Sequence, residues 1–342
     1  MSKLPDHVGI DFGNYSVKAV ELQNIRSNPT LFAFGDQSIP VGVLNSEEKQ
    51  HQKKLSDALK MLYRSSGIRN KKVVLAIPES AVFTRYIDLP GLKESELNTA
   101  VFFKAKQYIP IPIEEVQMSY IVLGYEESKN AFNILLVAAP KKSIDIYLNI
   151  ASQAGLETLA IETESIAIGR SMYRATNMRH MVILDFGSKT TDMSIMYDGK
   201  MIFSQSIAIG SDAMTQALVN QFGFEYAQAE QYKRNYGVVE NILENKVYDT
   251  FKPILDAILT EVQRGVEFYK TTILRSAPQD FLLNGDGAML PGLSEFIKKT
   301  FNVNTYVADP WVNIQIPDKL QALVEKNKPS FSVALGLALK EF

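Results

Sequence analysis

Two Asp-Phe-Gly triplets carry the strongest sign of chemistry in this sequence. They begin at Asp11 and Asp185, and each follows a run of β-branched or apolar residues that predicts a strand. The glycines of the triplets, Gly13 and Gly187, let the backbone turn tightly and leave its N–H groups bare, and small polar residues follow them. Bare N–H groups and hydroxyls in a turn form an anion-binding concavity, and a carboxylate fits beside a phosphate when a hydrated Mg²⁺ lies between them. Two such turns facing each other would grip a polyphosphate.

The two triplets open two halves of the chain that resemble each other. Residues 8–20 read VGIDFGNYSVKAV, and residues 182–194 read VILDFGSKTTDMS. Each half is predicted to continue as strand, glycine-bearing turn, strand, short turn and strand, and Asp198-Gly199 is a strong two-residue hairpin signal. A single turn of this kind is commonly an ordinary hairpin, but two copies at equivalent places favour a shared ligand site.

A third glycine-bearing turn follows in the second half. Residues 281–293 read FLLNGDGAMLPGL, so an apolar strand runs into Gly285 and Gly287, and a helix is predicted over 293–301. Close approach of bare backbone suits the flat face of a nucleoside. The protein-kinase reading of Asp-Phe-Gly fails, because the sequence has neither a G-x-G-x-x-G loop nor an H-R-D catalytic loop.

Composition narrows the function classes further. The 342 residues include 36 Lys plus Arg and 38 Asp plus Glu, and the formal net charge of −2 argues against nucleic-acid binding. With no cysteine and three histidines, disulfides, Cys-ligated metals and a His-based metal site are disfavoured. The first residues do not read as a signal peptide, and no apolar run approaches the roughly 18–20 residues that span a bilayer. We expect a cytoplasmic protein of about two domains.

In their order along the chain, the three turns resemble phosphate loop 1, phosphate loop 2 and the adenosine motif of the actin-like ATPase superfamily. Three segments narrow the resemblance to the PilM family of type IV pilus assembly: VGIDFGNYSVKAVEL at 8–22, AEQYKRNYG at 229–237 and EVQRGVEFY at 261–269. The resemblance implies an α/β actin-like ATPase fold. Two RNase H-like lobes would carry a 1C subdomain of the FtsA and PilM type and a helical 2B subdomain.

The resemblance also implies which residues bind the cofactors, ATP and Mg²⁺. Asp11 and Asp185 would hold Mg²⁺ through water, and Glu164, which starts the helix linking the lobes, would orient water or complement the dipole of that helix. Glu230 and Lys233, three residues apart and hence on one helical face, would lie over the adenosine. The implied nucleotide-binding residues are Asp11, Gly13, Asn14, Tyr15, Ser16, Lys18, Asp185, Gly187, Ser188, Thr190, Thr191, Gly210, Glu230, Lys233, Gly285, Asp286, Gly287 and Leu290.

Some positions depart from the family pattern. Asn14 and Tyr15 stand where Ser or Thr usually follow the glycine, and we expect Tyr15 to point away from the site, because neighbours alternate faces in extended backbone. Asp286 interrupts the usual three glycines and is expected to face a ribose or solvent. Glu162 is a second acidic candidate beside Glu164, but no arginine finger or clear general base is identifiable, so turnover should be slow at most.

We expect seven segments along the chain. They are 1–80 (lobe 1A with phosphate loop 1), 81–155 (subdomain 1C), 156–180 (return of lobe 1A and connecting helix), 181–211 (lobe 2A with phosphate loop 2), 212–280 (subdomain 2B), 281–329 (lobe 2A with the adenosine motif) and 330–342 (a C-terminal helix packing on lobe 1A). Long helices are predicted over 47–65, 94–108, 253–275 and 331–342, and the last has few charges, which favours core packing.

The expected function is that of an ATP-binding scaffold of type IV pilus, or related secretion-system, assembly. By resemblance, a groove between lobe 1A and subdomain 1C would hold the N-terminal cytoplasmic tail of a PilN-like inner-membrane protein. Other pilus platform proteins would be further partners, and a homo-oligomer or filament is compatible with the superfamily. Four apolar residues are candidates for this groove or for the core: Leu89, Val101, Phe102 and Phe103. The protein would be peripheral at the inner membrane through partners, without inserting directly.

Two other functions remain open at this point. An FtsA- or MreB-like cytoskeletal scaffold is disfavoured, because the sequence shows neither a basic amphipathic C-terminal helix nor an early inserted subdomain. A small-molecule kinase of the same superfamily is disfavoured, because little of the chain is left for a second substrate pocket.

Overall fold

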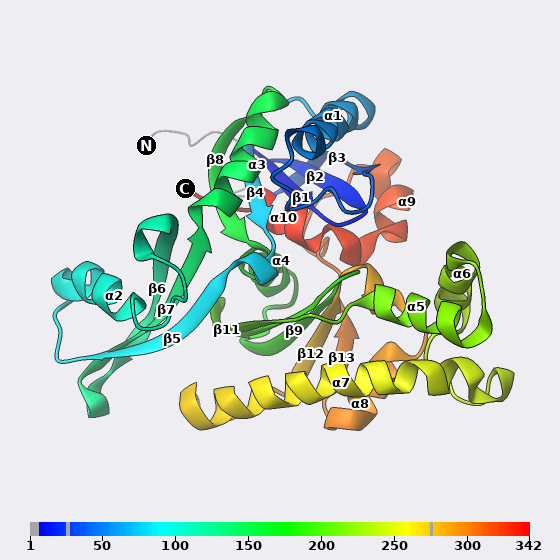
Figure 1. Ribbon diagram of the computed structural model, residues 1–342. Helices are drawn as coiled ribbons and strands as arrows, with labels where there is room; N and C mark the ends of the chain where they lie inside the picture. Colours follow the sequence, from blue (N-terminus) through cyan, green and yellow to red (C-terminus); the bar gives the residue numbers. More distant parts are fainter. Residues whose placement is uncertain (1–6, 25–27, 274–275) are drawn as a thin grey trace.

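The first half of the chain builds a five-stranded sheet in the order β3-β2-β1-β4-β8 (Figure 1). The computed structural model describes residues 7–24, 28–273 and 276–342. β1, β2 and β3 pair antiparallel, whereas β4 and β8 extend the sheet in parallel from β1. The strands are β1 (Val8–Phe12), β2 (Ser16–Gln23), β3 (Thr30–Ser38), β4 (Lys72–Ile77) and β8 (Glu157–Thr163).

Helices cover both faces of this sheet, because alternate residues of its central strands are apolar on each side. Val73, Leu75 and Ile77 of β4 join a core with α1 (Lys49–Ser66) and α3 (Lys141–Gln153). The intervening Val74 and Ala76 pack with α4 (Glu164–Thr176) and α10 (Ser332–Ala338). A central strand that is buried on both faces is typical of a parallel α/β sheet.

The C-terminal helix α10 is packed against the first sheet at a glycine. A Cβ added to Gly9 of β1 would lie 2.0 Å from the carbonyl oxygen of Ala334 on α10. Every residue of α10 is buried, which confirms the expected core packing. The predicted helix over 331–342 is too long, however, because α10 ends at Ala338.

The second half repeats the arrangement of the first. Its five-stranded sheet has the order β11-β10-β9-β12-β13, with three antiparallel strands followed by two parallel additions. The strands are β9 (His180–Phe186), β10 (Thr191–Tyr197), β11 (Lys200–Ile207), β12 (Asp280–Asn284) and β13 (Asn304–Val307). The internal repeat that the two triplets predicted is therefore a repeat of sheet topology.

A smaller unit projects from the side of the molecule in Figure 1. It is a three-stranded sheet in the order β5-β7-β6, packed against α2 around a separate apolar core. Its elements are β5 (Phe83–Pro90), α2 (Leu97–Ala105), β6 (Val116–Glu126) and β7 (Ala131–Pro140). All four lie within the segment 81–155.

The remaining helices belong to the second half. They are α5 (Ser211–Phe222), α6 (Tyr226–Tyr236), α7 (Lys246–Phe268), α8 (Leu293–Phe301) and α9 (Asp318–Lys326). The predicted helix over 253–275 begins too late, because α7 starts at Lys246. A short π-helix, Tyr269–Ile273, follows α7. The last two residues of the predicted helix, and residues 1–6, lie outside the described residues. Within the described ranges, no helix has the length and apolar character needed to cross a membrane.

Candidate functional site

A cleft of about 960 Å³ is lined by residues from both five-stranded sheets. It brings together nearly all of the residues that the sequence analysis predicted to bind nucleotide or Mg²⁺ or to orient water. Those that line it are Asp11, Gly13, Asn14, Tyr15, Ser16, Lys18, Glu164, Asp185, Gly187, Ser188, Thr190, Gly210, Glu230, Lys233, Gly285, Asp286, Gly287 and Leu290. Residues from positions far apart in the chain thus converge on one cavity.

Among the residues predicted to bind nucleotide, Thr191 is the one that the cleft lining does not include. Its side chain is fully buried, and its hydroxyl donates a 2.8 Å hydrogen bond to the carbonyl oxygen of Ile209. Thr190 and Thr191 are neighbours where β10 begins, so their side chains point to opposite faces of the sheet. Thr190 lines the cleft, and Thr191 fixes the segment after β11.

The first turn is a hairpin between β1 and β2. The backbone N–H of Gly13 donates a 3.0 Å hydrogen bond to the carbonyl oxygen of Ser16, which closes the turn. Asp11, at the cleft end of β1, is opposite Lys18 in the antiparallel register. Lys18 Nζ lies 3.4 Å from Asp286 Oδ2, so this lysine ties the first turn to the third.

The second turn depends on close backbone contacts. Asn284 Nδ2 donates a 2.8 Å hydrogen bond to Asp185 Oδ1, which fixes that carboxylate at the end of β9. A Cβ on Gly210 would lie 2.4 Å from the carbonyl oxygen of Ser188, so only glycine fits where α5 begins. The bare start of α5 therefore lies against the turn, as an anion site requires.

The third turn also packs glycine against the second. A Cβ on Gly287 would lie 2.8 Å from the Phe186 carbonyl oxygen, and Gly285 adopts a positive φ of 79°. Opposite this turn, α6 presents Glu230 and Lys233, joined by a 2.6 Å ion pair. Lys233 also donates a 2.8 Å hydrogen bond to Thr215, so the pair has a fixed geometry on the cleft wall.

Four largely buried acidic side chains share the cleft: Asp11, Asp185, Asp192 and Glu164. Burial raises the pKa of Asp11 to about 6, while Lys18 opposes the shift and Asp185 adds to it. Burial also raises the pKa of Asp185 to about 6 and that of Asp192 to about 7. The pKa of Glu164 lies well above its ordinary value because of burial and of the charge on Asp11. This surplus of negative charge favours a bound cation.

The residues present fit a hydrated Mg²⁺ better than a directly ligated one. Among the described residues, no cluster of three or more His, Asp or Glu side chains is arranged to hold a metal ion. Mg²⁺ commonly keeps several waters and is bound through one or two carboxylates together with phosphates. Asp192 Oδ1 and Asn284 Oδ1 are buried without a hydrogen-bond partner in the described part of the chain, so acceptors for such waters are available.

The two acidic candidates beside the connecting helix differ in their surroundings. Glu164 lines the cleft, and its Oε2 accepts a 3.2 Å hydrogen bond from the backbone N–H of Glu79. Glu162 instead pairs with Arg170 at 2.8 Å and with Lys340 near the C-terminus. Glu162 therefore has a structural role, and Glu164 remains the candidate for orienting water.

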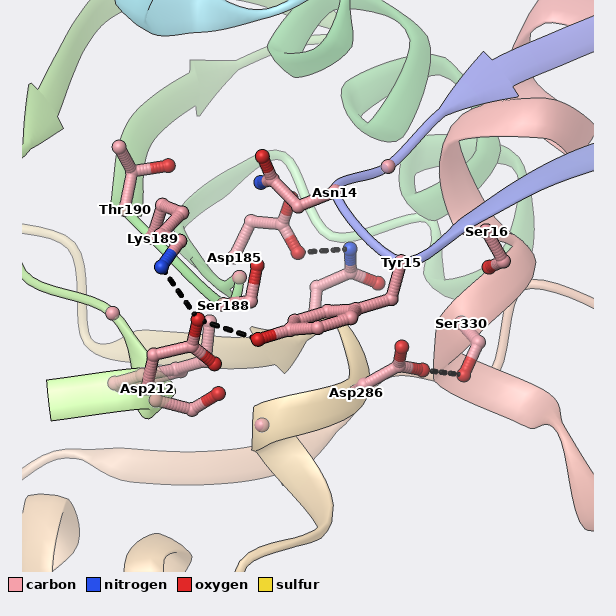
Figure 2. A pocket seen from close by; sticks show the side chains of 18 of the residues that line it. Asn14, Tyr15, Ser16, Asp185, Ser188, Lys189, Thr190, Asp212, Asp286 and Ser330 are labelled. Carbon is pink, nitrogen blue, oxygen red and sulfur yellow. Dashed lines mark hydrogen bonds and ion pairs between the residues drawn. The ribbon is translucent and has the colours of Figure 1, made fainter. Parts of the chain in front are cut away.

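Tyr15 crosses the mouth of the cleft, so the prediction that it points away from the site is wrong. Its hydroxyl donates a 2.7 Å hydrogen bond to Asp212 Oδ2 at the start of α5 (Figure 2). The same hydroxyl lies 3.3 Å from the hydroxyl of Tyr226. Asp212 also forms a 2.9 Å ion pair with Lys189 of the second turn. The aromatic side chain reaches far enough to find partners on the opposite lobe, which alternation along one strand does not anticipate.

Asp286 lies at the other side of the same opening. Its Oδ1 accepts a hydrogen bond from Ser330 (Figure 2). Its Oδ2 faces Lys18. The carboxylate is largely exposed, in agreement with the expectation that it faces a ribose or solvent.

Sequence reasoning missed Lys189, Asp192, Asp212 and Asn284. Lys189 and Asp192 stand inside the second motif, and Asn284 directly precedes Gly285 of the third, so proximity to a glycine turn could have identified them. Asp212 follows Gly210 by two positions, and an acidic residue in the first turn of a helix reads as an ordinary dipole partner.

A second cavity, a groove of about 510 Å³, lies where three parts of the structure meet. One wall is the 3₁₀ turn Glu79–Ala81, which follows β4, and the others come from β5 with the segment after α2 and from β11. β5 and β11 are each an edge strand of their sheet. Thr84 of β5 and Ser204 of β11 join these edges, with their hydroxyl oxygens 2.9 Å apart.

The apolar residues nominated for a groove do not line this one. Leu89 and Val101 are buried in the core of the three-stranded unit. Phe102 and Phe103 are exposed on α2, where Lys106 lies over both rings. The apolar residues that do line the groove include Phe83 and Tyr108 at the surface and Leu136 within the unit.

A family model described as type IV pilus assembly protein PilM matches residues 9–342. The chain belongs to the PilM family. One chain of a solved PilM–PilN type IV pilus biogenesis complex is 26% identical, has a TM-score of 0.85 and aligns over 98% of both chains. MreB5 of Spiroplasma citri bound to AMPPNP is similar at 14% identity and a TM-score of 0.53, over 95% of this chain and 98% of that one. This member of the PilM family thus has the actin-like ATPase fold.

Curated relatives match over shorter stretches. The Escherichia coli ethanolamine utilization protein EutJ is 26% identical over 46% of this chain and 50% of its own length. The cell division protein FtsA of Borreliella burgdorferi is 22% identical over 69% of this chain and 64% of its own. The PilM-family chain therefore spans between half and two thirds of these relatives. The link to type IV pilus assembly rests on the family model and on the PilM–PilN structure, not on these two relatives.

Proposed function

We propose that this PilM-family scaffold binds ATP with Mg²⁺ in the cleft. The observation that carries the proposal is the convergence of three glycine turns and two carboxylates, from distant parts of the chain, on one cavity. Bare N–H groups of the first two turns suit the phosphates, and the third turn with α6 suits the adenosine. MreB5 of Spiroplasma citri, with the same fold, has been solved bound to AMPPNP.

In this proposal each charged group has a defined task. Asp11 and Asp185 hold the waters of Mg²⁺, which neutralises the phosphates and relieves the repulsion between the two carboxylates. Lys18 keeps the first and third turns together, and Glu164 orients water for slow hydrolysis at most. Glu230 and Lys233 fix the wall against which the adenosine lies.

Titration with a fluorescent ATP analogue tests this site. Asp11→Ala should abolish Mg²⁺-dependent binding, whereas Asp57→Asn on the exposed face of α1 should leave it unchanged. Unchanged affinity in the Asp11 variant would show that the cleft is not the nucleotide site.

We further propose that the groove binds the N-terminal cytoplasmic tail of a PilN-like inner-membrane protein. The most similar fold described above is that of a chain solved in a PilM–PilN complex. An extended peptide can gain main-chain hydrogen bonds from a sheet edge and side-chain contacts from pockets. The groove offers the edges of β5 and β11 together with the exposed rings of Phe83 and Tyr108.

The position of the groove couples it to the cleft in this proposal. Ser80 lines both cavities, and Gln205 and Ser206 bring the second lobe into the groove wall. Closure of the two lobes around a nucleotide would therefore move one groove wall relative to the other two. Equal affinity for the tail with and without ATP–Mg²⁺ would refute this coupling.

A further inference from the structure

The groove contains two buried polar atoms that lack partners. Glu79 Oε2 and Ser206 Oγ form no hydrogen bond of regular geometry with the described residues, although the Ser206 hydroxyl lies near enough to Asp192 to lower the pKa of that acid. Both residues line the groove. Glu79 is only 3% exposed, so its carboxyl lies within the inner wall rather than at the rim. A buried polar atom without a partner is costly, and native structures contain few of them.

The residues around Glu79 meet the hydrogen-bonding needs of its carboxyl group only in part. Burial raises the pKa of Glu79, while the hydroxyls of Ser204, Ser165 and Thr163 lower it without cancelling the effect. The backbone N–H of the same residue donates to Glu164, which anchors the turn between groove and cleft. The wall is therefore held in place while one carboxyl oxygen remains available.

No basic side chain of the described residues forms an ion pair with Glu79. Arg85 also lines the groove, but its guanidinium group lies over the ring of Tyr108, with the guanidinium carbon 5.1 Å from the ring centre, rather than beside the Glu79 carboxylate. Two other acids lie near the turn, Glu164 and Asp192, and both increase the local negative charge. A positive charge that enters the groove would thus meet an uncompensated acid.

We propose that Glu79 and Ser206 form a specificity pocket for one basic side chain of the bound tail. The Arg or Lys of the tail would donate to Glu79 Oε2 and to Ser206 Oγ, and Glu79 would bind it as the ionised carboxylate. The aromatic rim, Phe83 and Tyr108, would contact apolar neighbours of that residue. This inference rests on the proposed function, because it concerns the tail that the groove is proposed to hold.

The test uses the full-length chain and the fluorescein-labelled N-terminal segment of its PilN-like partner, with fluorescence anisotropy as the readout. Truncating one partner of a buried, hydrogen-bonded charge pair weakens binding by about 30-fold or more. We expect that loss for Glu79→Gln, which keeps the shape and removes the charge. Glu115→Gln, an exposed acid of the same projecting unit, is the matched control and should change affinity by less than about twofold.

A mutant cycle identifies the basic residue. Each Arg or Lys of the tail is replaced by Gln in turn, and one replacement should weaken binding to the wild type but not to Glu79→Gln. Thermal unfolding and ATP–Mg²⁺ binding check that the variant is folded. If it is not, Ser206→Ala decides, with an expected loss of several-fold.

The outcomes separate this inference from the function on which it rests. A wild-type protein that fails to bind the tail contradicts the proposed function itself. Wild-type binding that is unchanged by Glu79→Gln, or by Ser206→Ala where that variant decides, overturns the specificity pocket and leaves the groove proposal standing. A cycle in which no basic residue of the tail couples to Glu79 also overturns it.

Discussion

Replacing Asp11 by asparagine should stabilise the nucleotide-free protein at pH 8, although it removes a group proposed to hold Mg²⁺. The pKa of Asp11 is raised from 3.8 to about 6, because the residue is buried and faces Asp185. A carboxyl whose pKa is raised by folding favours the folded state below its unfolded pKa. That contribution is lost as the pH rises through the folded value.

The size of the effect follows from the shift. Two pKa units correspond to about 3 kcal/mol at pH 8, and to about 1.5 kcal/mol at pH 5, where the unfolded carboxyl is ionised and the folded one is mostly protonated. An asparagine carries no charge and avoids this penalty at both values. The raised pKa already includes the attraction of Lys18, and an asparagine amide differs from a protonated carboxyl, so we expect a gain of about 1–3 kcal/mol at pH 8 and roughly half of that at pH 5.

Urea unfolding followed by far-UV circular dichroism at both pH values measures the gain. The matched control is Asp57→Asn, an exposed aspartate paired with Lys60 on α1, which should change the free energy of unfolding by less than about 0.5 kcal/mol. In parallel, ATP–Mg²⁺ should stabilise the wild type and not the Asp11 variant. A variant that is less stable than the wild type at pH 8, or whose gain is the same at pH 5, would refute the electrostatic reasoning.

Three further predictions test other parts of the structure. Gly9→Ala should destabilise the fold by about 3 kcal/mol or more, because its Cβ would meet the backbone of α10, whereas Gly124→Ala, with nothing within 4 Å of its Cβ, should be nearly neutral in chemical denaturation. Tyr15→Phe removes the hydrogen bond to the start of α5, so stopped-flow measurements should show ATP-analogue release several-fold faster. Thr84→Val breaks the contact with Ser204 between two sheet edges; calorimetry should then show a smaller effect of ATP–Mg²⁺ on tail affinity, and an unaltered effect would contradict the proposed route of coupling.

The parts of the site that sequence could predict are those set by local backbone chemistry. Asp11 and Gly13 are only two positions apart. A strand that ends at an acidic residue shortly before a glycine has few alternatives to a tight turn, so the first turn could be predicted from its own residues. The repeated order of strands around Asp185 then predicted a second lobe of the same topology, and β9 to β11 confirm it.

The parts that sequence could not predict depend on distant partners. The hydroxyl of Tyr15 is fixed by Asp212, which is 197 positions away, and no local pattern contains that contact. Glu79 stands in a short Pro-Glu-Ser-Ala segment that reads as an exposed turn, yet packing by β11 and the projecting unit buries it. The start of α7 was placed at Pro253, since proline is common in the first turn of a helix, whereas the helix already begins at Lys246. The end of α10 was misjudged because no glycine or proline marks the residue where the backbone leaves the helix.

Calorimetric titration of the PilN-like tail into the wild-type protein, with and without ATP–Mg²⁺, tests the central claim most directly. We predict one binding site per chain and an affinity that differs between the two nucleotide conditions. Absence of binding heat under both conditions, checked by anisotropy with the labelled tail, would contradict the account of the chain as a nucleotide-binding scaffold that recruits this partner.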